Sequence, residues 1–114
     1  NGTEANMTEK LNNLCNYLKK EKSCQLVVCL SQLGYKNGSS MNDLELAKHS
    51  KQLDVIIGSH PSDFCKYPVV VQNCEHAEVV IHSAANNLSG LGNIEFAFDE
   101  NNNKNWIAFN NHIA

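Results

Sequence analysis

The sequence has few features that would direct it to a membrane, to nucleic acid or to a cross-linked scaffold. No apolar run approaches the roughly 20 residues needed to span a bilayer. The net charge of −3 favours neither nucleic acid nor an anionic membrane surface as a partner. The five cysteines are odd in number and show no C-x-x-C spacing, which excludes a complete disulfide framework and leaves one or two bridges open. No signal-peptide pattern begins the chain, although processing would remove one.

The length and composition are those of one small globular domain. A chain of 114 residues can bury roughly two-thirds of its unfolded surface. The apolar content of 42% and the charged content of 18% are ordinary for a soluble protein. Because no repeat, low-complexity tract or linker divides the sequence, we expect residues 1–114 to form a single domain.

The most informative stretch is an apolar run that ends at a glycine and is followed by a histidine. Residues 55–57 are contiguous and β-branched, which predicts a strand buried on both faces. Gly58 permits a tight turn, so that His60 falls in a loop just past the carboxyl end of the strand. Residues 25–30 form a similar run that leads to Gln32. Two strands that end side by side would bring Gln32 and His60 toward one another.

Two amphipathic helices are predicted in the first half of the chain. The first runs from about 7 to 22, with Asn6 as its N-cap. Its apolar stripe consists of Leu11, Leu14, Cys15 and Leu18. The lysines within residues 19–22 are interpreted as a solvated helix end. The second helix runs from about 42 to 51 with Asn42 as its N-cap, between the two apolar runs. This strand–helix–strand order predicts parallel strands.

The second half of the chain predicts antiparallel strands. Residues 68–71 and 78–81 flank a turn and form a hairpin. Residues 83–92 are expected to be a loop, residues 94–98 alternate as a half-buried strand, and a last strand from Trp106 to Phe109 pairs back. The fold class is therefore α/β, with a strand–helix–strand unit followed by antiparallel strands.

Three pieces of the sequence, in this order and spacing, resemble one family. Val28-Cys-Leu-Ser-Gln-Leu-Gly-Tyr35 is similar to the V-x-L-S-H-L-G-Y segment of calcineurin-like metallophosphoesterases of the 5′-nucleotidase branch. Residues 43–47 and 53–60 resemble that branch's D-x-x-L-A and I-D-x-I-I-G-G-H-x-H segments. Residues 79–81 and 91–94 are similar to its closing strands, V-x-I and L-G-x-I. The resemblance covers roughly residues 8–110.

The resemblance implies half of a four-layer αββα sandwich with a metal site at the carboxyl ends of its strands. Two metal ions there, of zinc, manganese or iron, would activate a water and hold phosphate oxygens. Gln32 stands where the family has a first histidine ligand, His60 retains the second, and Ser62 replaces the third. The expected metal residues are therefore His60 and Gln32, with no catalytic residue assigned and substrate contacts unknown.

The family's remaining ligands lie in its first half, as Asp-x-His, Gly-Asp and Gly-Asn-His motifs. Neither Asp-x-His nor Gly-Asp occurs in this chain. The resemblance thus implies a partial domain with a degraded metal site. It also suggests a periplasmic or extracellular location, which the residues themselves do not decide.

Other interpretations of the same residues remain open. His60 can be an ordinary loop histidine, since one imidazole alone binds metal weakly. His60, Asp63 and Cys65 share a loop and form a possible replacement metal site, one ligand short of a usual structural zinc site. Ser62 is a candidate nucleophile for which the sequence identifies no base. The remaining histidines are expected in structural positions: His49, His76, His82 and His112.

Three hypotheses for function follow. In the first, the chain is a degenerate or truncated 5′-nucleotidase-like domain without hydrolase activity of its own and without a bound cofactor. In the second, another chain or region completes it as an active metal-dependent nucleotide phosphohydrolase. In the third, half a sandwich leaves an apolar sheet face and open strand edges, so the chain self-associates or binds a complementary half-domain.

Overall fold

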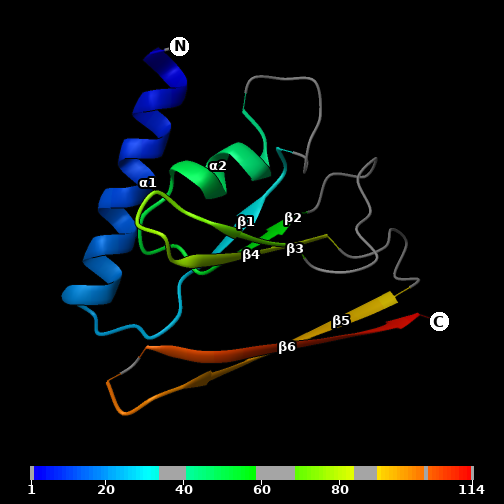
Figure 1. Ribbon diagram of the computed structural model, residues 1–114. Helices are drawn as coiled ribbons and strands as arrows, with labels where there is room; N and C mark the ends of the chain where they lie inside the picture. The colour runs from blue at the N-terminus through cyan, green and yellow to red at the C-terminus, as the bar shows by residue number, and fades with distance from the viewer. Residues whose placement is uncertain (1, 34–40, 59–68, 84–89, 102, 114) are drawn as a thin grey trace.

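The computed structural model describes residues 2–33, 41–58, 69–83, 90–101 and 103–113 (Figure 1). Its elements, in chain order, are α1 (Gly2–Lys20), β1 (Val28–Ser31), α2 (Asp43–His49), β2 (Val55–Gly58), β3 (Val69–Gln72), β4 (Glu78–Ser83), β5 (Gly90–Phe98) and β6 (Lys104–Ile113). The predicted α/β class, with parallel strands first and antiparallel strands after them, is confirmed.

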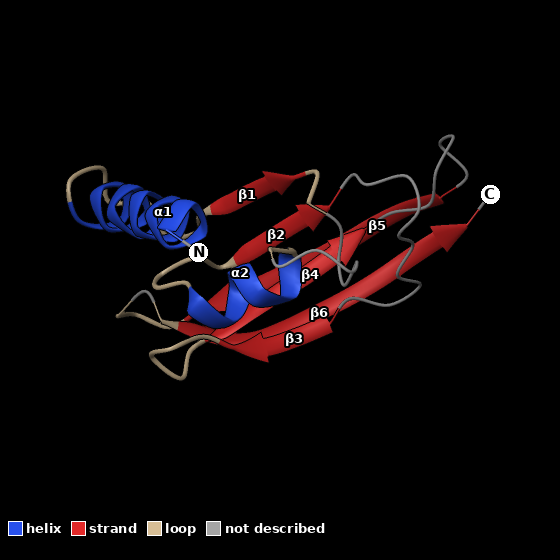
Figure 2. Ribbon diagram, turned by 90° about the horizontal axis from the view of Figure 1, so that it is seen from above, coloured by secondary structure: helices blue, strands red, loops and turns tan. Residues whose placement is uncertain are grey.

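A four-stranded sheet and a two-stranded hairpin form separate layers. The sheet has the order β1-β2-β4-β3, in which β1, β2 and β4 are parallel and β3 is antiparallel. Both helices lie on one face of this sheet, and the β5–β6 hairpin crosses the other face (Figures 1 and 2). The β3–β4 hairpin was predicted from its strands and turn and is confirmed.

The first helix differs from its prediction at both ends. It begins at Gly2 and ends at Lys20, so Asn6 lies inside the helix instead of capping it. Its predicted stripe packs on the sheet through Cys15, which is fully buried, whereas Leu14 is 53% exposed. Neither of the helices that the structure describes is long and apolar enough to cross a membrane.

The second helix forms as its cap predicts. Asn42 has extended backbone angles, and its side-chain oxygen accepts a hydrogen bond from the Glu45 N–H at 2.9 Å. This contact satisfies one of the N–H groups that the start of a helix leaves unpaired. The helix packs by its Leu46 and Ala47 side onto the sheet, so the predicted strand–helix–strand unit is confirmed.

The core lies between the sheet and the two helices. Alternate residues of β2 and β4 point into it, including Ile56, Val79 and Ile81. The opposite face of the sheet is buried only under the hairpin, at positions such as Val55. The edge strand β1 starts at Val28 and is shorter than predicted. Its Leu30 side chain lies on the hairpin side of the sheet and is 81% exposed.

The cysteines that the structure describes carry free thiols: Cys15, Cys24, Cys29 and Cys74. Cys15 is buried, while Cys24 and Cys29 are half-buried. Burial raises the pKa of the Cys15 thiol to about 11. This side chain therefore behaves as a small neutral core residue.

The hairpin is longer than its sequence pattern indicates. Strand β5 begins at Gly90, within the stretch expected to be a loop, and β6 extends from Lys104 to Ile113. The turn between them is held by Asp99, whose carboxylate accepts hydrogen bonds from the N–H groups of Asn101 and Asn103. The two strands pair antiparallel along their length, as predicted for the last strand.

Candidate functional site at the carboxyl edge of the sheet

The three parallel strands end level with one another. Ser31 of β1 is in register with Gly58 of β2, and Gly58 with Ser83 of β4. The carboxyl ends of parallel strands at one sheet edge are the usual place for a site in an α/β fold. The expectation that the first two strands end side by side is thus confirmed.

The structure places one of the predicted metal residues at this edge. Gln32 follows β1 directly and its side chain is exposed to solvent. The other residues considered for metal or catalysis lie outside the described residues: His60, Ser62, Asp63 and Cys65. The approach of Gln32 to His60 therefore stays a prediction.

A buried serine–carboxylate pair supports the chain just before Gln32. Ser31 Oγ donates a hydrogen bond to Asp43 Oδ1 at 2.5 Å, and the Leu33 N–H donates to Ser31 Oγ at 3.1 Å. Asp43 is only 1% exposed at the start of α2. Burial, with the Asp43 charge as a smaller cause, raises the pKa of the nearby Cys29 thiol. The pair joins the end of β1 to α2 and so fixes the path of the chain into Gln32.

His82, near the end of β4, has an environment that the sequence pattern did not reveal. It lies on β4 in register with Ile57 of β2 and is 4% exposed. Its Nδ1 atom is buried without a hydrogen-bond partner, and burial lowers the pKa of the imidazole. Alternation along β4 places this side chain on the hairpin side of the sheet. The interpretation of His82 as a strand residue is confirmed, and the structure adds that the ring is buried and neutral.

The described residues at this edge do not by themselves make up a two-metal centre. Among the residues that the structure describes, no group of three or more His, Cys, Asp or Glu side chains could hold a metal ion. Gln32 offers a neutral amide oxygen where the resemblance implies an imidazole, which zinc prefers. Asp43, the carboxylate that contacts the end of β1, is buried and engaged with Ser31. We therefore derive no catalytic step through a metal ion.

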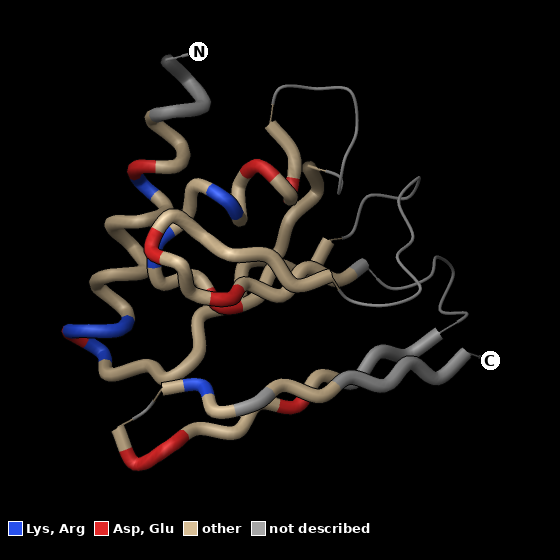
Figure 3. Tube along the Cα trace, in the orientation of Figure 1, with Lys and Arg blue, Asp and Glu red and all other residues tan. Residues whose placement is uncertain are grey.

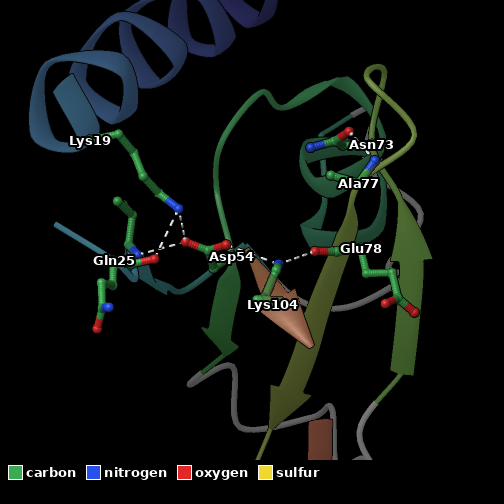
Figure 4. A network of polar contacts seen from close by, with 8 residues as sticks. Lys19, Gln25, Asp54, Asn73, Ala77, Glu78 and Lys104 are labelled. Atoms are coloured by element: carbon green, nitrogen blue, oxygen red, sulfur yellow. Dashed lines mark hydrogen bonds and ion pairs between the residues drawn. The ribbon is translucent and has the colours of Figure 1, made fainter. Parts of the chain in front are cut away.

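The opposite edge of the sheet carries a buried ionic network that sequence analysis missed (Figure 4). Asp54 Oδ2 accepts a hydrogen bond from the Val27 N–H at 2.9 Å and pairs with Lys19 Nζ at 2.7 Å. Asp54 Oδ1 pairs with Lys104 Nζ at 2.9 Å, and Lys104 also donates to the Glu78 carbonyl oxygen at 2.6 Å. The network joins α1, the starts of β1, β2 and β4, and the hairpin.

The interpretation of the lysines at the end of α1 as a solvated cluster is wrong for Lys19. Figure 3 shows the basic residues gathered at this end of α1, but their surroundings differ. Lys19 is partly buried against Asp54 and also donates to the Gln25 carbonyl oxygen at 3.1 Å, whereas Lys20 is exposed. The sequence feature that could have predicted this contact is Asp54, because it lies within an apolar run. A carboxylate buried there requires charged or hydrogen-bonding partners.

We expect Lys19→Met to lower the free energy of unfolding by about 1–3 kcal/mol, because it removes a charge-assisted hydrogen bond from a buried carboxylate. Lys20→Met, one residue along the same helix, is the matched control and should change stability by less than about 0.5 kcal/mol. Urea unfolding followed by circular dichroism measures both. Equal losses in the two variants would contradict a structural role for the Lys19 pair.

The burial of His82 predicts a loss of stability in acid. Its pKa is lower in the folded chain than in the unfolded chain, so the unfolded state binds more protons as pH falls. The neutral imidazole's contribution to the free energy of unfolding is fully present above the ordinary pKa of about 6.5. It is lost progressively as the pH falls below that value. Unfolding free energies measured from pH 7.5 to 5 should fall more steeply for the parent chain than for His82→Leu. Parallel pH curves would contradict the assignment.

Comparisons with known proteins support the resemblance. The chain is 30% identical over 92 residues, 81% of its length, to the trifunctional nucleotide phosphoesterase protein YfkN of Bacillus subtilis (strain 168). Its fold matches the crystal structure of a 5′-nucleotidase precursor from Thermus thermophilus over 93% of the chain, with a TM-score of 0.77 and 24% identity. No protein-family model matches the chain.

The chain covers only a part of each of these proteins. It spans 6% of the length of the Bacillus protein and 22% of the Thermus chain. Both matches nevertheless extend over most of the 114 residues of this chain. The expected resemblance and fold class are therefore confirmed: the chain resembles nucleotide phosphoesterases in sequence and has the fold of part of the matched 5′-nucleotidase precursor.

Proposed function

We propose that this chain is the C-terminal half of a 5′-nucleotidase-like domain whose metal site is degraded, and that it does not hydrolyse phosphate esters on its own. The observation that carries the proposal is Gln32, an exposed amide at the strand end where the resemblance implies an imidazole ligand. Ser62 makes a second such replacement, in the sequence. A neutral amide and a neutral hydroxyl are weak partners for zinc.

The edge retains the scaffold that would position such a site. The three strand ends are level, and the Ser31–Asp43 pair anchors the segment that presents Gln32. This arrangement supports a fold kept after the loss of its ligands. In this proposal, His60 is a remnant of the family's ligand set and carries no chemistry alone.

A second candidate function is an active hydrolase completed by another chain or by a further region of the same protein. The chain covers 6% of the Bacillus protein and 22% of the Thermus chain, and this partial coverage favours the second candidate. The completing part would supply the ligand motifs that this sequence lacks. Gln32 and Ser62 would still weaken the metal site, so activity would be well below that of an enzyme with three histidines.

The sheet surface beside the hairpin supports an interaction role in either case. Val28 and Leu30 of β1 are exposed on the same face on which Val55 of β2 is buried under the hairpin. Strand β1 also stands at the edge of the four-stranded sheet, where a further strand can add. We propose that the remainder of a metallophosphoesterase domain covers this surface, and that the isolated chain pairs with a second copy there.

A location outside the cytoplasm belongs to the same proposal. The matched Thermus protein is described as a 5′-nucleotidase precursor. Fractionation of cells that express the full-length product containing this chain tests this location. The product should be found outside the cytoplasm.

We expect the chain to bind zinc or manganese no more tightly than millimolar, because one imidazole does not make a metal centre. Restoring ligands in Gln32→His/Ser62→His should tighten zinc binding at least tenfold in calorimetry at pH 7.5, where imidazole is neutral. His60→Ala in that background should remove the gain. Micromolar binding by the parent chain that disappears in His60→Ala would refute the proposal, as would metal-dependent nucleotide hydrolysis that follows the purified chain.

We expect the isolated chain to show a mass that rises with concentration in sedimentation equilibrium. Leu30→Lys, at the 81% exposed position of β1, should weaken this association at least tenfold because it places a charge on the apolar face. Leu14→Lys, at an exposed position of α1, is the matched control and should leave the association unchanged. A monomer mass at every concentration would rule out pairing through β1.

A further inference from the structure

We draw no further inference here: the strongest candidate, the surface patch of exposed apolar side chains along α1 formed by Met7, Leu14 and Tyr17, is an unpartnered helix face, and nothing in the structure shows what covers it.

Discussion

The carboxylate of Asp54 is the interaction on which the arrangement of the layers depends. It is buried at the start of β2 and receives a backbone N–H from the segment before β1 and ammonium groups from Lys19 and Lys104. A buried carboxylate is costly unless such partners surround it. The partners come from a helix on one face of the sheet and a hairpin on the other. Their charges therefore tie both layers to the central strand.

The two edges of the sheet have different roles. At the carboxyl edge, level strand ends and the Ser31–Asp43 pair hold Gln32 where the family resemblance implies a histidine. At the amino edge, the Asp54 network closes one side of a polar cavity that Asn73 also lines. In the function proposed above, the first edge keeps a scaffold whose ligands have changed. The second combines a buried ionic network with a hollow lined by polar residues.

The hairpin covers only the middle of the sheet's second face. Val55 and Val80 are buried beneath it, while Leu30 at the β1 edge stays exposed. An apolar edge of this kind is typical of a surface that meets another layer of protein. The chain covers 22% of the matched Thermus chain, and the remainder of such a domain is the occupant proposed above for this surface.

Local patterns in the sequence determined the elements whose cause is local. The Asn42 cap starts α2, and the β-branched run 55–57 forms the buried strand, because caps and side-chain periodicity act within a few residues. The N-terminal start of α1 and the long β5–β6 pairing escaped prediction, since the ends of elements depend on neighbours distant in sequence. The order of the motifs indicated the resemblance to 5′-nucleotidases and the position of Gln32. Only the tertiary structure decided that Lys19 pairs with Asp54 and that His82 is buried, because burial is set by which segments pack together.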